Sequence, residues 1–264
     1  MSDNRDVPGV VVGTGSAIPA ALSAARFRQK FGISAPFVVY VGRIDENKGC
    51  KELFAFFEQY ARTSRQPTVL VLMGHSLVPI PESPYVKHLG FVSDEDKFDG
   101  IAASDALIMP SFFESLSMVA LEAWALGKPV LANGRCDVLR GQVVRSNAGL
   151  YYESFQEFAE TLRVLTVNRD LAAAMGRNGR AFHREHYDWP VVEGKYERML
   201  ASLHSAGTSP SALEPEPGWL AARRRTLPPA RQVVEALPSG PVLAERPAPK
   251  PATTRRRGLY RGHR

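Results

Sequence analysis

The sequence predicts an open, doubly wound α/β domain built around a single parallel sheet. Between residues 37 and 132, short runs rich in Val, Ile and Leu alternate with stretches that carry apolar residues at helical spacing. Turn-forming residues such as Gly, Pro, Asp and Ser separate the two kinds of segment. Strands that alternate with helices of this length form βαβ units, whose parallel strands are covered by helices on both faces.

The first strand is expected at 37–42 (FVVYVG), because this apolar run is long enough for a buried strand and too short for a helix. A helix is expected at 94–104, where acidic residues at its start suit the helix dipole. Another helix, at 115–126, should stop at Gly127 and Pro129. The remaining elements are expected as a helix at 53–61 and strands at 68–74, 86–92, 106–110 and 129–133.

After residues 149–152 the pattern becomes purely helical, with helices expected at 154–167, 170–186 and 189–203. These helices should pack on the sheet or cross to a neighbouring domain. The resulting division is an N-terminal linker segment at 1–34, an α/β domain at 35–204 and a tail at 205–264.

The basic charge of the chain is concentrated in that tail. Residues 205–264 hold 11 Arg/Lys against 4 Asp/Glu, which gives them a net charge of +7. Because the net charge of the whole chain is +6, residues 1–204 carry a net charge of −1. Ten of the 20 prolines also lie there. Such a composition predicts a disordered tail. It could be a solvated tail, a contact to anionic lipid or nucleic acid, or a partner-binding motif around Trp219; the charge does not support a basic nucleic-acid-binding domain.

Only two cysteines occur, Cys50 and Cys136, too few for a disulfide framework and without metal-ligand spacing. The N-terminus lacks the apolar core of a signal peptide, and no uninterrupted apolar stretch is long enough to span a bilayer. We expect a cytoplasmic protein, with peripheral contact at the inner membrane left open by the basic tail.

The first candidate site is the loop at 42–49, directly after the first strand. In open parallel sheets, ligands bind at the carboxyl ends of strands, near the point where the strand order reverses. Arg43 can make a forked contact and Lys48 a point-charge contact with a diphosphate. Lys48 also lies at the expected start of a helix, where a cation is unfavourable unless an anion is bound. A polar loop with solvated charges is the structural alternative.

The second candidate site spans residues 110–122. Glu114 lies in the expected strand-to-helix turn, and Glu122 lies inside an otherwise apolar helix, so its carboxylate should have a partner. A carboxylate can accept two hydrogen bonds from a vicinal diol such as that of ribose. Residues 115–118 should offer free N–H groups to a phosphate at the helix start. A structural salt bridge or an exposed helix would explain the same residues.

Two further segments have features in common with ligand-binding loops. The backbone at 89–94 could contact the edge of a nucleobase, although a plain strand-to-helix connection is an equal explanation. Residues 13–18 (GTGSAI) begin like a dinucleotide fingerprint, but Ile18 replaces the third glycine and Pro19 leaves no room for the helix. The second pattern is therefore rejected.

From about Gly13 to Leu203 the chain resembles the donor-binding half of retaining glycosyltransferases with the GT-B fold, in the family that includes glycogen-synthase-like, mannosyl- and sucrose-type enzymes. Glu114 and Glu122 have the family's E-x7-E spacing. The segments that carry the resemblance are GRIDENKG, GFVSDEDK, PSFFESLSMVALEAWALGKPVLANG and NAGLYY.

The resemblance implies a role for each matching residue. Arg43 and Lys48 would bind the donor diphosphate and neutralise the leaving group in place of a metal, so no cofactor and no metal site are expected. Glu114 would bind sugar hydroxyls, and these three are the expected catalytic residues. Glu122 would bind ribose, and Val92 would meet the base through its backbone. The other expected donor-binding residues are Gly42 and the backbone amides of Leu116, Ser117 and Met118, with Ser117 standing where relatives often carry glycine.

The implied reaction transfers a sugar from a nucleotide-sugar donor to an acceptor hydroxyl with retention. GT-B enzymes carry the acceptor site on a second Rossmann-like domain, and the roughly 35 residues before the first strand are too few for one. A separate acceptor-domain chain is therefore the expected partner, and the acceptor (glycan, lipid or small molecule) stays open. The alternatives are a non-catalytic nucleotide-sugar-binding module, a degenerate fragment, or an adaptor that acts through its tail.

Overall fold

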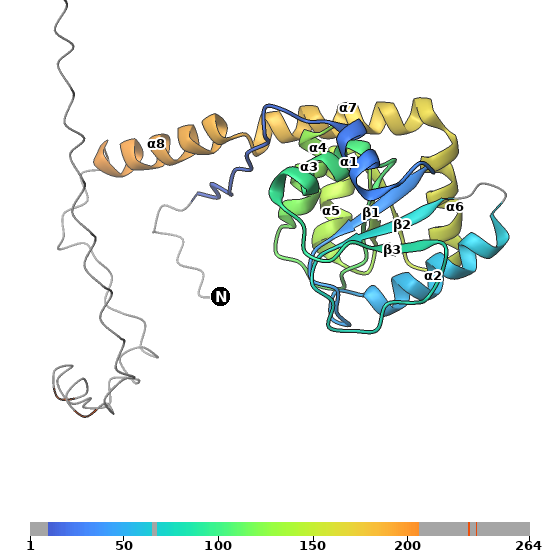
Figure 1. The fold of residues 1–264 in the computed structure, drawn as a ribbon. Helices are drawn as coiled ribbons and strands as arrows, with labels where there is room; N and C mark the ends of the chain where they lie inside the picture. Colours follow the sequence, from blue (N-terminus) through green and yellow to red (C-terminus); the bar gives the residue numbers. More distant parts are fainter. Residues whose placement is uncertain (1–9, 65–67, 206–231, 233–235, 237–264) are drawn as a thin grey trace, which may run out of the picture. The chain divides into compact units, whose positions relative to one another are not determined.

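The computed structural model describes residues 10–64, 68–205, 232 and 236 (Figure 1). The described residues from 10 to 205 belong to one compact unit. The disorder expected for the tail concerns residues that lie almost entirely outside the described part of the chain. Among the described helices, none is both long and apolar enough to cross a bilayer.

A six-stranded sheet forms the centre of the unit, and its strands pair in parallel throughout. The spatial order is β3-β2-β1-β4-β5-β6, so the order reverses between β1 and β4. This is the doubly wound arrangement, which confirms the predicted fold class. The strands are β1 (Phe37–Val41), β2 (Val69–Met73), β3 (Val86–His88), β4 (Leu107–Met109), β5 (Val130–Asn133) and β6 (Gly149–Tyr152).

Two helical layers cover the sheet, as Figure 1 shows. Side chains alternate along β1, so Phe37 and Val39 join the core on one face while Val38 and Tyr40 join the core on the other. The helices are α1 (Ala24–Phe31), α2 (Cys50–Thr63), α3 (Asp94–Ala103), α4 (Met118–Ala125), α5 (Asp137–Ser146), α6 (Phe155–Val167), α7 (Arg169–His186) and α8 (Trp189–Ser205). The first core contains residues of α1, α3, α4 and α5, and the second contains residues of α2, α6 and α7.

All the expected strands are present, each somewhat shorter than predicted and β3 most of all. Helix α4 begins at Met118 rather than at residue 115, because Ser117 adopts a left-handed conformation (φ 65°) that cannot continue a helix. Two helices were missed. Helix α5 carries Gly141 and a weak apolar pattern, and α1 lies within the segment that was expected to be a linker at 1–34.

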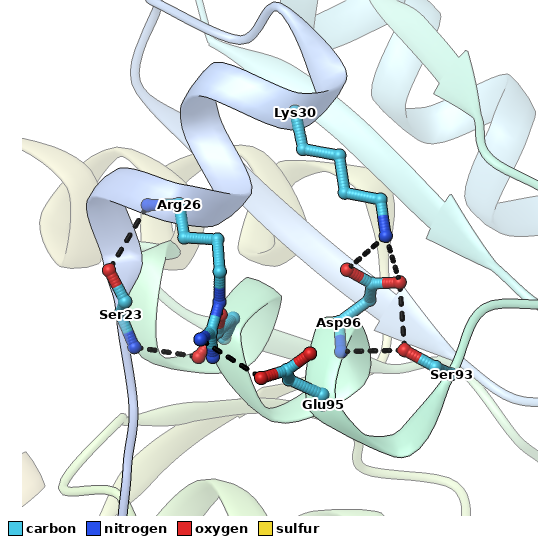
Figure 2. A network of polar contacts seen from close by, with 7 residues as sticks. Ser23, Arg26, Lys30, Ser93, Glu95 and Asp96 are labelled. Carbon is cyan, nitrogen blue, oxygen red and sulfur yellow. Dashed lines mark hydrogen bonds and ion pairs between the residues drawn. The ribbon is translucent and has the colours of Figure 1, made fainter.

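Helix α1 is part of the α/β unit because buried carboxylates of α3 bind its cations. Asp99, which is 1% exposed, accepts hydrogen bonds from the Ser23 backbone N–H (2.7 Å) and from Arg26 Nε (2.6 Å). Lys30 Nζ lies 2.8 Å from a carboxylate oxygen of Asp96. In Figure 2 these side chains extend from α1 towards α3. The linker assignment is therefore wrong for the part of the segment that forms α1.

The same network fixes the start of α3. The hydroxyl of Ser93 accepts a hydrogen bond from the backbone N–H of Asp96 and donates one to its carboxylate (2.8 Å; Figure 2). The hydrogen bond from Lys30, and then those from Ser93, lower the pKa of Asp96 below its usual value despite burial. Residues 92–97 are thus held at the edge of the sheet where ligands bind in this fold.

Candidate active site

The candidate site lies at the carboxyl ends of β1 and β4, on either side of the point where the strand order reverses. The loop after β1 begins at Gly42 (φ 146°), whose backbone N–H donates to the Met73 carbonyl and so continues the pairing with β2. Tyr40, buried in the core, donates a hydrogen bond to the Arg43 carbonyl (2.6 Å). Burial raises the pKa of the Tyr40 hydroxyl far above its ordinary value, so Tyr40 remains a donor at neutral pH.

Asp45 organises the rest of this loop. Its carboxylate accepts a hydrogen bond from the Lys48 backbone N–H (2.8 Å) and pairs with the Arg43 guanidinium. Burial opposes the charge, but the hydrogen bond from Arg43, followed by those from the loop backbone, lowers the pKa of Asp45 below its usual value of 3.8. Asp45 therefore stays ionised at neutral pH and keeps the loop folded around it.

The loop after β4 is held by two amide side chains. Asn133, at the end of β5 and fully buried, donates to the Pro110 carbonyl (3.0 Å), and Gln142 on α5 donates to the Leu116 carbonyl (2.8 Å). Between these two points lies Glu114. Its position thus depends on two neighbouring elements, β5 and α5, rather than on the loop alone.

Each of the two motif carboxylates is paired with a lysine. Lys48 Nζ lies 2.7 Å from Glu114 Oε1, and the two side chains are 32% and 11% exposed. Lys97 Nζ, on α3, lies 3.0 Å from Glu122 Oε1, with side chains 20% and 12% exposed. The partner expected for Glu122 is therefore present. The other oxygen, Glu122 Oε2, is buried and has no hydrogen-bond partner.

A cleft of about 460 Å³ opens beside Lys97. It brings together the ends of β1 and β2 and the start of α3. Three of the predicted residues, Gly42, Arg43 and Val92, line it, together with Lys97. The other lining residues are Val41, Met73, Gly74, His75, Phe91 and Asp94.

The remaining predicted residues are not among those that line the cleft, and they form two groups. Lys48 and Glu114 form the ion pair between the two loops, and Glu122 lies one turn inside α4. Leu116, Ser117 and Met118 lie at the start of α4, where Leu116 already uses its carbonyl as an acceptor. Lys97 and Asp45 were not among the residues expected at the site. The one sequence feature that pointed to Lys97 was indirect: the carboxylate of Glu122, inside an apolar helix, requires a cation as its partner.

Within the described residues, no group of three or more His, Cys, Asp or Glu side chains is arranged to hold a metal ion. The thiols of Cys50 and Cys136 are both buried and unpaired. Burial raises the pKa of Cys50, which keeps its thiol protonated and unreactive.

Ser117 provides a test of the backbone at the start of α4. It has a positive φ, and its hydroxyl accepts a long hydrogen bond from the Ala120 N–H (3.4 Å) and donates one to Met109 Sδ (3.9 Å). Because glycine adopts this conformation without steric cost, we expect Ser117→Gly to be more stable than Ser117→Ala by about 1 kcal/mol. Urea unfolding of the two variants measures this difference. Equal stabilities would show that the backbone conformation does not limit this position.

Sheet order, the two loops and their charged residues define a Rossmann-like domain of the GT-B kind, in which a ligand binds beyond the carboxyl ends of the strands. Sucrose-phosphate synthase from Thermosynechococcus elongatus has this fold, with a TM-score of 0.61 at 22% identity over 74% of this chain and 53% of that one. Anabaena HepE in complex with UDP-glucose gives a TM-score of 0.57 at 22% identity, covering 69% of this chain and 52% of that one.

The chain belongs to the family "Glycosyl transferases group 1", whose model matches residues 23–182. It is 29% identical over 193 residues to the phosphatidyl-myo-inositol mannosyltransferase of Propionibacterium freudenreichii, which covers 69% of this chain and 48% of that protein. It is 30% identical over 200 residues to the D-inositol 3-phosphate glycosyltransferase of Gordonia bronchialis, covering 68% and 42%. The chain thus spans about half the length of the curated relatives it matches.

Proposed function

We propose that this chain provides the donor-binding half of a glycosyltransferase and binds a nucleotide sugar in the cleft beside Lys48, Glu114 and Glu122. The observation that carries the proposal is the buried, unpaired oxygen of Glu122. A buried acceptor without a hydrogen-bond donor is unfavourable by about 1–3 kcal/mol unless a ligand supplies the donor. A ribose diol has two hydroxyls suited to this role.

Charge and position support a diphosphate between the two loops. Arg43 and Lys48 both lie in the loop that follows β1, and each is paired with a carboxylate through one contact only. A guanidinium has five N–H donors and an ammonium three, so both cations keep donors for phosphate oxygens. When the bond from the sugar to the diphosphate breaks, these donors would stabilise the negative charge on the leaving group without a metal ion.

Glu114 and Val92 would make the remaining contacts with the donor. Glu114, already fixed by Lys48, would accept hydrogen bonds from sugar hydroxyls, and the backbone of Val92 would meet the base. Transfer would proceed with retention and mainly through positioning and electrostatic stabilisation. We infer that an acceptor domain outside the described residues completes the enzyme, in line with the expected acceptor-domain partner.

The donor site is tested by isothermal titration of the 264-residue chain with UDP-glucose, GDP-mannose, UDP and GDP. We expect Glu122→Gln to weaken the binding of the preferred nucleotide about tenfold, because the amide replaces one acceptor oxygen with a donor. The matched control is Glu160→Gln, which changes an exposed carboxylate on α6 that pairs with Arg163. Binding unaffected by Glu122→Gln would reject the site.

A non-catalytic binding module would use the same contacts, so affinity cannot distinguish it from an enzyme. The distinguishing measurement is the release of free nucleotide from the donor sugar, with and without a candidate acceptor-domain protein. Release that requires Lys48 and Glu114 supports the enzyme. Tight binding without release under both conditions supports the module.

A further inference from the structure

Glu122 has a neighbour, Lys97, that no sequence motif singled out and that contacts Glu122 from another element. Lys97 lies on α3, and Glu122 lies 25 residues later on α4. The pair joins two helices at the wall of the cleft, which Lys97 itself lines. A contact of this kind can either bind the ligand directly or hold a residue that binds it.

The surroundings of the Lys97 ammonium favour the second role. Its Nζ lies close to three groups of the protein: Glu122 Oε1 at 3.0 Å, Asp94 Oδ1 at 3.3 Å and the ring of Phe98, whose centroid is 4.2 Å from Nζ. Of these, Glu122 Oε1 accepts a hydrogen bond from the ammonium, and Asp94 forms an ion pair with it. Lys97 is therefore engaged mainly with other side chains of the protein.

The two carboxylate oxygens of Glu122 differ in their hydrogen bonding. Oε1 accepts from Lys97, whereas Oε2 is buried and without a donor. Without the ammonium, the carboxylate could rotate about its last bond and would lose the charge that compensates its burial. Lys97 thus keeps one oxygen bound, while the other has no donor among the described residues.

We infer that Lys97 is a positioning residue for the donor site: it holds Glu122 so that one carboxylate oxygen is presented to the hydroxyls of a nucleotide ribose. The inference rests on the proposed donor site and adds to it how the ribose-binding carboxylate is oriented. It assigns a function to α3 beyond its contribution to the core, because the helix carries the cation that prepares its neighbour α4.

The test compares ribose-containing nucleotides with nucleotides that lack the diol. The full chain is titrated with UDP, GDP and their 2′,3′-dideoxy counterparts, in the wild type and in Lys97→Met. We expect Lys97→Met to weaken the binding of the ribonucleotide about tenfold and to leave the dideoxy nucleotide unchanged, because only the first uses Glu122. Lys97→Arg, which restores a cation, should recover most of the loss.

The matched control is Arg163→Met, which removes an exposed ion pair to Glu160 on α6, outside the lining of the cleft. It should change neither the affinity for the nucleotides nor the preference for the diol. Equal losses for both nucleotides in Lys97→Met, or no loss at all, would overturn the positioning role while the donor site stands. If the wild type binds no nucleotide, or does not prefer the diol, the donor site and this inference both fail.

Discussion

Replacing Lys48 with methionine is expected to weaken the binding of UDP or GDP about a hundredfold, the largest effect on affinity of any single change proposed for this site. Two causes act together. The diphosphate loses a cation, and the Glu114 carboxylate, 11% exposed, loses the ammonium 2.7 Å away that neutralises it. The uncompensated carboxylate would then repel the phosphates. Isothermal titration against both nucleotides measures the loss.

The double variant Lys48→Met/Glu114→Gln separates these causes. Removing the carboxylate should recover part of the lost affinity, because the repulsion disappears while the missing cation does not return. Lys51→Met is the matched control, since Lys51 lies three residues away and makes an ion pair with Glu46 in which both side chains are largely exposed. A loss as large in Lys51→Met, or no loss in Lys48→Met, would contradict the assignment of Lys48 to the diphosphate.

Gly49→Ala is expected to lower the free energy of unfolding by about 2–5 kcal/mol. Gly49 precedes α2 with φ 72°, and a Cβ at this position would lie 2.2 Å from the Pro110 carbonyl oxygen. Both the left-handed backbone and the backbone contact therefore oppose a side chain. Because Pro110 opens the loop that carries Glu114, a shift there would also displace the ion pair to Lys48.

The matched control for Gly49→Ala is Gly90→Ala. Gly90 has the same φ of 72°, but nothing lies within 4 Å of a Cβ built on it. Urea unfolding should show a cost of about 1–2 kcal/mol for Gly90→Ala, the part caused by the backbone alone. Similar losses of unfolding free energy in the two variants would show that the contact with the Pro110 carbonyl adds nothing to the cost at Gly49.

The fold was largely predictable because its signal is local. The strand runs of Val, Ile and Leu and the Gly and Pro residues that end the helices specify a parallel α/β sheet without knowledge of distant contacts. The same logic places Lys48 and Glu114 near each other, because both follow strands of one sheet at its carboxyl edge. The ion pair between the two side chains was not predicted, but it agrees with this placement.

The errors come from contacts between residues far apart in sequence. Helix α1 was missed because its burial depends on carboxylates of α3 that lie 66 to 76 residues later. Lys97 was missed for the same reason, since its partner is on another helix. The late start of α4 depends on the positive φ of Ser117, which cannot be predicted from the presence of a serine at this position.

The contacts between α1 and α3 also decide where the domain can be cut. An excised domain that started at residue 35, as the strand pattern alone would suggest, would leave Asp96 and Asp99 without Lys30, Arg26 and the Ser23 N–H. Two buried carboxylates would then face water or an apolar neighbour, beside the helix turn that carries Lys97. The family match begins at residue 23, the first residue of this network. The unit built around this sheet therefore starts before its first strand and includes at least α1 and the residue that caps it.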